Sequence, residues 1–297
     1  MSSLRSLVAR WSVAALQLLV AALAPAAWPL AAWPLAASSL AAQAAPEIYA
    51  VRYGALADFP VSSLVAGADS ARRLDVALTV WVIKPGNGRI VLVDAGFYRE
   101  KFMTRWTPVD YQKPSDAIRV LGITPEQVTD IIVSHVHWDH ADGIDLFPNA
   151  TVWIQREEYE HHVGGGGVSL DRAVDALDAA MLYALRQAGR VRLVDGDAQE
   201  IMPGIHVYTG GKHTFASQYA GVVTTKGTVV LASDNAYLYE NLDSRAPIAQ
   251  TLDRASNLAA QQRMLELAGT TGVVVPGHDP AVFTRFPSVG KGAVRIR

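Results

Sequence analysis

The chain has 297 residues, half of them hydrophobic, and carries 26 Lys and Arg against 28 Asp and Glu, a formal net charge of −2. This slightly acidic balance lacks the basic surface that a phosphate-backbone partner needs, so we expect no nucleic-acid partner and a small neutral or apolar substrate. The absence of cysteine excludes disulfides, thiol nucleophiles and thiolate metal ligands.

Residues 1–44 have the layout of a secretory signal peptide. Two arginines precede an apolar core at 13–24, and Ala42-Gln43-Ala44 is an A-x-A cleavage site. We expect cleavage after Ala44, a secreted or periplasmic location and one folded domain over 45–297. An uncleaved anchor is the alternative, but the prolines within 25–34 argue against a continuous membrane helix, so we expect no stable membrane span after cleavage.

Short β-branched runs bounded by turn residues predict strands at 48–52, 77–83, 90–93, 129–133, 151–154, 191–194, 205–208, 219–225, 228–231 and 272–275. The sequence Lys84-Pro85-Gly86-Asn87-Gly88 predicts a hairpin between the second and third of these. Helices are predicted at 115–121 with Ser115 as its cap, and at 155–162, 170–188 and 252–268. Two runs of strands with helices between them fit an α/β protein, a four-layer αββα sandwich.

The helix predicted at 170–188 has an apolar face. Its members recur at helical spacing and are expected in the core: Leu170, Val174, Leu177, Met181 and Leu185.

The segment from His135 to His140 reads His-Val-His-Trp-Asp-His, four metal-ligand side chains in six positions directly after a predicted buried strand. In an extended segment, His135 and His137 point to the same side and can bind one ion. Asp139 and His140 follow where the chain turns and can face a second ion. A solvated histidine-rich loop is the alternative interpretation.

Three more residues that can bind a metal follow β-branched runs that end in Gly, Pro or Ser: His213, Asp234 and His278. Each alone has an ordinary explanation, a hydrogen-bonded histidine or an aspartate that caps a turn. Together with the first segment they give five His and two Asp. That set suits two zinc-like ions, one held by three His, the other by two His and Asp139, with Asp234 bridging.

The HxHxDH segment, followed in order by Gly-Gly-x-His-Thr, an Asp and Gly-His, resembles the metallo-β-lactamase superfamily over residues 48–286. The resemblance implies that His135, His137 and His213 hold one metal. It implies that Asp139, His140 and His278 hold the other, with Asp234 between them. Asp94-Ala95-Gly96 matches an early Asp-x-Gly turn, whose Asp supports such a site from behind the ligands.

Two divalent ions about 3.5–4 Å apart activate a shared water and polarise a carbonyl or phosphoryl oxygen, so hydrolysis is the predicted chemistry. The sequence has no Gly-x-Ser-x-Gly elbow and no Walker loop, and we interpret Gly164-Gly165-Gly166-Gly167 as a flexible loop.

Tyr237, three residues after Asp234, resembles the Asp-x-x-Tyr of N-acyl homoserine lactonases. The resemblance implies that its hydroxyl hydrogen-bonds the lactone oxygen. On general acid–base grounds we expect Asp139 to pass a proton to the leaving alkoxide. An ordinary half-buried tyrosine is the alternative. The loop at His213 departs from that family, because Lys212 is inserted before the ligand and Phe215-Ala216 replaces Pro-Gly.

These observations predict a zinc-dependent hydrolase that opens the ring of N-acyl homoserine lactones, an activity that quenches quorum sensing. A secreted aryl-ester or organophosphate hydrolase of the same fold is the first alternative. An iron-dependent sulfur dioxygenase and a non-catalytic metal-binding protein are the others. Metal content separates the dioxygenase, which holds one iron, from a hydrolase that holds two zinc ions.

Overall fold

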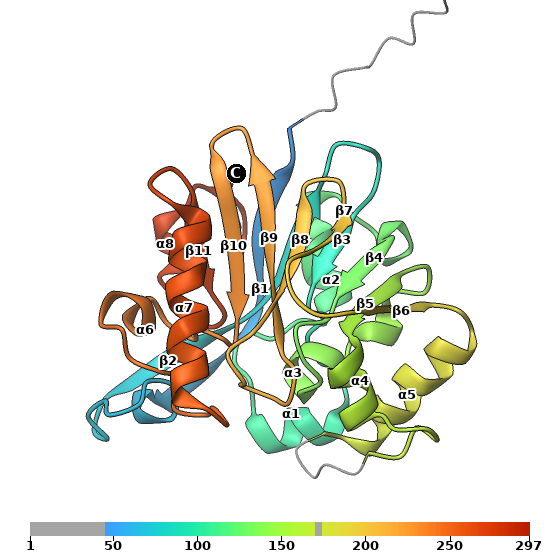
Figure 1. Cartoon of the computed structure of the whole chain (residues 1–297), viewed down its shortest axis with the longest axis horizontal. Coiled ribbons are helices and arrows are strands. Elements are labelled where there is room, and N and C mark those ends of the chain that lie inside the picture. Colours follow the sequence, from blue (N-terminus) through green and yellow to red (C-terminus); the bar gives the residue numbers. More distant parts are fainter. Residues whose placement is uncertain (1–44, 170–173) are drawn as a thin grey trace, which may run out of the picture. The chain divides into compact units, whose positions relative to one another are not determined.

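The computed structural model describes residues 45–169 and 174–297, which contain two β-sheets (Figure 1). The predicted signal peptide lies outside the described residues. The eight-stranded sheet has the order β12 (Ser288–Gly290), β13 (Ala293–Arg295), β1 (Glu47–Pro60), β2 (Arg73–Lys84), β3 (Val91–Val93), β4 (Asp130–Ile132), β5 (Thr151–Gln155) and β6 (Val191–Val194). The five-stranded sheet has the order β11 (Val273–Pro276), β10 (Gly227–Ser233), β9 (Gln218–Thr224), β8 (Ile205–Thr209) and β7 (Gln199–Met202).

Helices cover the outer face of each sheet, which confirms the αββα arrangement. The α-helices of the described ranges are α1 (Glu100–Trp106), α2 (Pro114–Ala117), α3 (Trp138–Ala141), α4 (Arg156–His162), α5 (Ala176–Gln187), α6 (Tyr239–Asp243), α7 (Arg254–Ala268) and α8 (Val282–Arg285). The long helix α7 packs on β10 and β11, whereas α2 contacts β1, and α4 and α5 contact β5 and β6 (Figure 1). No helix of the described ranges is long and apolar enough to cross a membrane.

The central strands of the larger sheet are buried on both faces. Along β2, Val80 and Val82 belong to one core cluster, shared with the helices, while Trp81 and Ile83 belong to a second cluster, shared with the smaller sheet. Alternate side chains of a strand point to opposite faces, so a run that is apolar throughout packs on both sides. The predicted hairpin is also present, because β2 and β3 pair antiparallel.

Two details of the helix predictions are wrong. Ser115 is not a cap, because α2 begins at Pro114 with Lys113 before it, and proline favours the first helical turn. The helix predicted at 170–188 begins at Ala176, where Asp175 accepts a hydrogen bond from the Leu177 backbone N–H. Leu177 therefore lies in the exposed first turn, with 54% of its surface accessible, and is not core.

Three other members of that predicted face do belong to the core or pack against it. Val174 is buried, and Met181 and Leu185 pack against the core. Leu170 lies outside the described residues. The sequence patterns missed β7, β12 and β13, which have three or four residues each, and the short helices α1, α3, α6 and α8.

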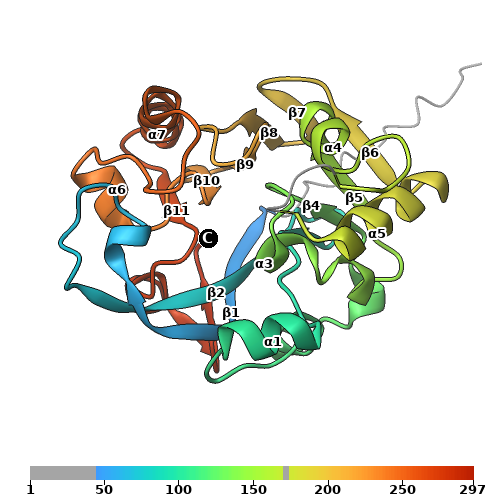
Figure 2. The ribbon, with the colours of Figure 1, turned by 90° about the horizontal axis from the view of Figure 1, so that it is seen from below.

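The topology brings the candidate ligands to one edge of the sandwich. Strands β3, β4 and β5 pair in parallel, as do β10 and β11 in the other sheet. Parallel strands end at the same edge, so the loops after β3, β4, β10 and β11 emerge together. Figure 2 views the chain from that end, where α3 lies.

Candidate metal centre

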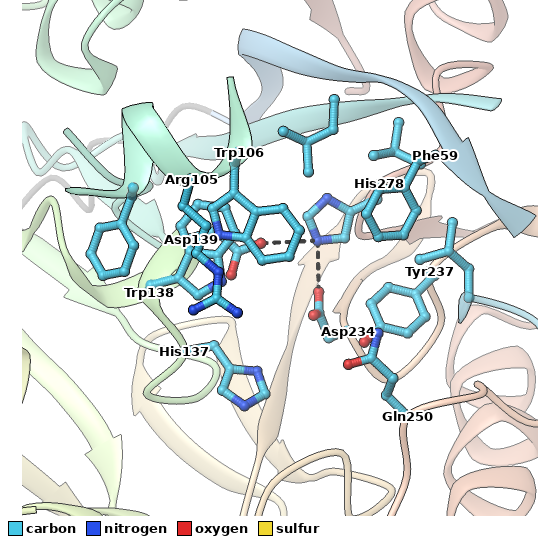
Figure 3. Close-up of a pocket in the computed structure, with 14 residues that line it drawn as sticks. Phe59, Arg105, Trp106, His137, Trp138, Asp139, Asp234, Tyr237, Gln250 and His278 are labelled. Atoms are coloured by element: carbon cyan, nitrogen blue, oxygen red, sulfur yellow. Dashed lines mark hydrogen bonds and ion pairs between the residues drawn. The ribbon is translucent and has the colours of Figure 1, made fainter. Parts of the chain in front are cut away.

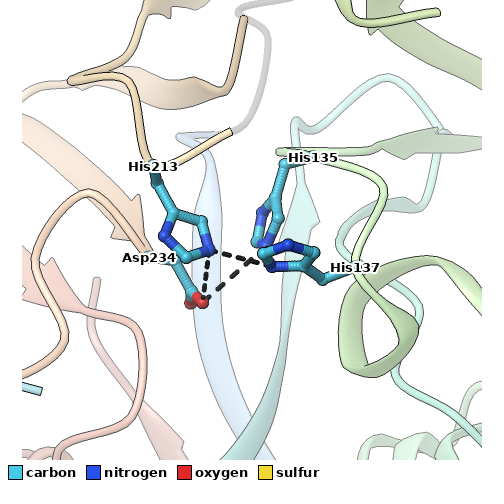
Figure 4. Close-up of side chains that lie close together, drawn as sticks. All are labelled: His135, His137, His213 and Asp234. Carbon is cyan, nitrogen blue, oxygen red and sulfur yellow. Dashed lines mark hydrogen bonds and ion pairs between the residues drawn. The ribbon is translucent and has the colours of Figure 1, made fainter. Parts of the chain in front are cut away.

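The first ligand group consists of His135, His137 and His213. The chain is extended after β4 as far as His137, which precedes the first turn of α3. The Nε2 atoms of His135 and His213 each lie 3.0 Å from Nδ1 of His137 (Figure 4). Three imidazole nitrogens therefore converge on one point.

The second group consists of Asp139, His140 and His278. Asp139 and His140 lie in α3, and His278 follows β11. Oδ2 of Asp139 lies 3.5 Å from Nε2 of His140 and 3.8 Å from Nε2 of His278. These three side chains offer one ligand atom each within 4.8 Å of one another.

Asp234, which follows β10, lies between the two groups. Its Oδ2 is 3.3 Å from Nε2 of His213 and 3.7 Å from Nε2 of His135. Its Oδ1 is 3.0 Å from Nε2 of His278 and 3.2 Å from Nε2 of His140. One carboxylate oxygen thus faces each group, which is the arrangement that a bridging ligand requires.

The outer nitrogens of the histidines are held by the fold. Nδ1 of His140 lies 2.7 Å from Oδ2 of Asp94, and Nδ1 of His213 and His278 lie 2.8 Å from the carbonyl oxygens of Gln250 and Ala77. Such contacts place the proton on Nδ1 and leave Nε2 as the free electron pair. The orientation suits metal coordination through Nε2.

The residues fit two divalent metal ions. Nε2 of His140 is buried and forms no well-aligned hydrogen bond, although carboxylate oxygens of Asp234 and Asp139 lie 3.2 and 3.5 Å away, an arrangement that an ion between these atoms would explain. The donor set of imidazoles and carboxylates without thiolate suits zinc and similar first-row metals.

The electrostatics of the two groups differ. Burial, strengthened by His140 and His213, lowers the pKa of His135 well below its usual value, and burial next to His213 lowers the pKa of His137 to about 4. Burial alone would also lower the pKa of His140 and His278. The neighbouring carboxylates, Asp234 first, outweigh burial and raise the pKa of both.

Asp94 supports both groups from behind, as the resemblance implied. It is fully buried, and its oxygens accept hydrogen bonds from the backbone N–H and hydroxyl of Ser134 and from the hydroxyl of Ser233, at 2.8 to 2.9 Å. Asp94 and Ser233 have positive φ angles of 61° and 47°. Such conformations cost free energy and persist where surrounding contacts fix them, often at functional sites.

The loops that carry His213, Asp234 and His278 are tied together. Oδ1 of Asn235 accepts from the Gly211 backbone N–H at 2.7 Å, and the Asn257 side chain donates to the Asn235 carbonyl at 2.9 Å. A Cβ atom at Gly277 would lie 2.7 Å from the Ser233 carbonyl oxygen, so only glycine allows this approach.

Glu158, in α4, is a supporting residue that the sequence patterns did not identify. It is completely buried, and Oε1 accepts from the Val136 backbone N–H at 3.2 Å and from the Thr214 hydroxyl at 2.7 Å. Its Oε2 accepts from the Ala216 backbone N–H at 2.7 Å. Val136 separates two ligands and Thr214 follows a third, so this carboxylate joins both loops of the first group.

The loop that departs from the lactonase pattern is well connected. Lys212 is half-buried, and its Nζ donates to the Phe215 carbonyl at 2.7 Å and lies 4.9 Å from the centre of the Phe215 ring. Phe215 stacks on His161 of α4 with ring centres 4.0 Å apart. Lys212 therefore stabilises its own loop and is not directed at a substrate.

A cavity of about 270 Å³ opens at the metal centre (Figure 3). His137, Asp139, Asp234, Tyr237 and His278 line its floor. Tyr237 is buried, and its hydroxyl lies 3.4 Å from Nδ1 of His213. Burial, with the charges of Asp234 and Asp139, raises the pKa of Tyr237 well above its usual value, so the hydroxyl keeps its proton at neutral pH.

The walls of the cavity come from β1, β2 and the segments around α1 and α3. They are mostly apolar: Leu56, Phe59, Leu64, Val76, Phe102, Trp106 and Trp138, with Arg105 and Gln250 as the polar members. The segment 97–114 contributes Phe102, Arg105 and Trp106 to these walls, whereas no residue of 161–169 lines this cavity.

Known proteins resemble this chain in sequence and in fold. Residues 75–278 match the profile of the metallo-beta-lactamase superfamily. The chain is 29% identical over 192 residues to N-acyl homoserine lactonase AttM of Rhizobium johnstonii, covering 61% of this chain and 70% of that protein. It is 32% identical over 165 residues to an N-acyl homoserine lactonase of Bacillus cereus, covering 54% and 60%. This chain thus spans 60–70% of the length of these two relatives.

Solved structures share the fold. A quorum-quenching N-acyl homoserine lactone lactonase superposes with a TM-score of 0.65 at 22% identity, over 79% of this chain and 92% of that one. AidC, a dizinc quorum-quenching lactonase, superposes with a TM-score of 0.60 at 16% identity, over 79% and 88%.

Proposed function

The chain belongs to the metallo-beta-lactamase superfamily, and from this premise we propose that it is a dinuclear zinc hydrolase that opens the lactone ring of N-acyl homoserine lactones. The observation that carries the proposal is Asp234, whose two oxygens face two separate groups of ligands at 3.0 to 3.7 Å. In this proposal His135, His137 and His213 hold one ion, and Asp139, His140 and His278 the other.

Two such ions supply an activated water and polarise the carbonyl of the substrate. The protein's own groups do the rest. Tyr237 donates its hydroxyl hydrogen to the oxygen on which negative charge develops, a role that its protonated state at neutral pH supports. Preorganised donors of this kind act strongly because the site is buried.

Asp139 is proposed to carry the proton to the leaving alkoxide. It lines the cavity, and its backbone carbonyl accepts a hydrogen bond from the hydroxyl of Tyr53 at 3.2 Å, which fixes the turn that presents its side chain. A carboxylate in that place can take a proton from the attacking water and return it to the oxygen that leaves.

The substrate class rests on the cavity and on the relatives. Apolar walls next to the ligands suit an acyl chain attached to a small polar ring. The two curated relatives named above are N-acyl homoserine lactonases, which favours a lactone over an aryl ester, a phosphotriester or a persulfide.

The test is turnover by the zinc-loaded protein. We expect N-acyl homoserine lactones to be opened with release of one acid equivalent, and chelation to abolish the activity. Two bound zinc ions without lactone opening would contradict the substrate but not the hydrolase. One bound iron, with oxygen consumption, would contradict the hydrolase itself.

Export to the periplasm or medium is a further part of the proposal, and it rests on the basic, apolar and A-x-A segments of residues 1–44. Mass spectrometry of the protein recovered from the periplasm of an expressing bacterium should give a chain that begins at Ala45. An intact chain that begins at Met1 in the membrane fraction would instead support an anchor.

A further inference from the structure

The cavity has two unlike walls, and only one of them carries a charge. The wall formed by β1, β2 and the segment between them is apolar, with Leu56, Phe59, Leu64 and Val76. The wall formed by α1 and α3 is aromatic and includes a guanidinium, with Phe102, Arg105, Trp106 and Trp138. A substrate in this cavity therefore meets its strongest hydrogen-bond donor on the side of α1.

The aromatic wall is held rigidly. Oδ2 of Asp142 accepts from the backbone N–H groups of Tyr98 and Arg99 at 2.7 and 3.0 Å, which fixes the start of α1. At the end of α1, the Trp106 ring stacks on Trp138 with centres 5.0 Å apart and planes 7° apart. Because Trp138 lies between the ligands His137 and Asp139, this stack sets the distance between α1 and the metal centre.

Arg105 extends this stack. Its Cζ lies 5.3 Å from the centre of the Trp106 ring, a cation–π contact that orients an otherwise exposed side chain. Figure 3 shows its guanidinium directed to the side of the cavity where His137 and Asp139 lie. Within residues 45–169 and 174–297, Arg105 has neither an ion pair nor a hydrogen bond, so its donors are available to a ligand.

Most other polar groups of the cavity are already engaged. The Gln250 side chain donates to the Ser63 carbonyl at 3.2 Å, and Tyr237 lies at the floor beside His213. The donors left on the lining side chains, apart from the guanidinium, are all neutral: the indole N–H groups of Trp106 and Trp138, one amide N–H of Gln250, the Nε2–H of His137 and the Tyr237 hydroxyl, which the proposed reaction uses. A guanidinium offers several donors in a fork and a full charge, whereas an indole offers one neutral donor.

A bound acyl homoserine lactone needs such a donor. With its ring at the metal centre, its amide carbonyl lies between the ring and the acyl chain and loses water inside the cavity. A buried carbonyl without a donor costs free energy. We propose that Arg105 donates to an acceptor oxygen of the substrate next to the scissile ring, the amide carbonyl of the acyl chain, and so selects amide-bearing lactones over plain alkyl lactones.

This inference rests on the proposed function, and its test separates the two. The wild-type zinc enzyme is assayed with an N-acyl homoserine lactone and with a γ-alkyl lactone of equal chain length that lacks the amide. We expect Arg105→Ala to lower kcat/KM for the amide-bearing lactone about tenfold, chiefly through KM, because a hydrogen bond from a charged donor is lost. We expect kcat/KM for the alkyl lactone to change by less than about twofold.

Two matched variants complete the design. Arg192→Ala removes an exposed arginine that does not line the cavity, and should leave kcat/KM for both lactones unchanged. Trp106→Phe keeps an aromatic ring but removes the indole N–H. It should lower kcat/KM for both lactones by the same factor.

The outcomes that overturn the role of Arg105 are specific. An equal loss for both substrates in Arg105→Ala, or no loss, contradicts it while lactone opening itself stands. A loss confined to the amide-bearing lactone in Trp106→Phe, with none in Arg105→Ala, assigns the donor to the indole. A wild-type enzyme that binds two zinc ions but opens neither lactone contradicts the proposed function together with this inference.

Discussion

The two ligand groups lie on either side of Asp234, yet they are built differently. Burial keeps His135 and His137 neutral, so the first group presents electron pairs that are ready for a metal. In the second group the carboxylates of Asp234 and Asp139 raise the pKa of His140 and His278, so protons compete with the metal there. Metal binding to the second group must release more protons, and we expect that group to lose its ion first on acidification.

The supports of the two groups also differ. Glu158 of α4 joins the loops of the first group. Asp94 contacts His140 of the second group directly and His135 of the first group only through Ser134. The two metal positions can therefore be disturbed to different degrees, through residues that touch neither the metal nor the substrate.

The largest effect is expected for Asp234→Ala, because this residue alone faces both groups. Its loss should reduce bound zinc from two to one or fewer per chain and lower kcat/KM on the order of a thousandfold or more. Metal analysis after gel filtration, together with lactone turnover, measures both. Two retained ions would show that Asp234 does not bridge.

Tyr237→Phe should leave metal binding by both ligand groups unchanged. It removes a hydroxyl that lies 3.4 Å from Nδ1 of His213 and leaves the ring in place. We expect kcat to fall about a hundredfold, as for other donors to a developing oxyanion, with two zinc ions still bound. Unchanged kcat would remove Tyr237 from the reaction, and lost zinc would make it a support of His213 instead.

The comparison of supports is tested by Glu158→Gln and Asp94→Asn. Each substitution should lower the affinity for one zinc ion more than for the other, by about ten- to a hundredfold, which is the usual effect of removing a hydrogen-bond partner of a metal ligand. Competition with a chromophoric chelator gives the two affinities, and cobalt spectra assign which position is lost. Glu160→Gln is the control, since this exposed residue of α4 contacts only Arg156 among the described residues. If the two variants weaken the same position, the supports are not separate.

The ligands themselves could be predicted from sequence because each follows a strand end in a local pattern. His213, Asp234 and His278 follow β-branched runs within a few residues. Parallel pairing of β10 and β11 brings Asp234 and His278 together, and β8 ends at the same edge because it and β10 both pair antiparallel with β9. Glu158 has no such pattern: it lies in an ordinary amphipathic helix, and its partner Thr214 is 56 residues away. Arg105 and Trp106 lie in a seven-residue helix without clear periodicity, so only tertiary packing places them at the cavity.

The smallest effect is expected for stability, at the ion pairs of Arg99, the residue that precedes α1. The Arg99 side chain pairs with both Asp142 and Asp178, two fully buried carboxylates. Burial, then the charge of Asp142, raises the pKa of Asp178 to about 7, although Arg99 opposes the shift. Because the folded protein favours the protonated carboxyl, this residue contributes stability at low pH that is lost as pH rises through about 7.

Asp178→Asn mimics the protonated form and should remove that pH dependence. Relative to wild type, we expect the free energy of unfolding of the variant to gain about 1.5–3 kcal/mol between pH 5 and pH 8, which corresponds to one to two pKa units. Urea unfolding at both pH values measures the difference, in which titrations common to both proteins cancel. Asp145→Asn is the control, because that half-exposed carboxylate lies 3.5 Å from Arg99. If Asp178→Asn loses as much stability at pH 8 as at pH 5, Asp178 is an ordinary ionised partner of Arg99, and the second group is supported by a fully charged network.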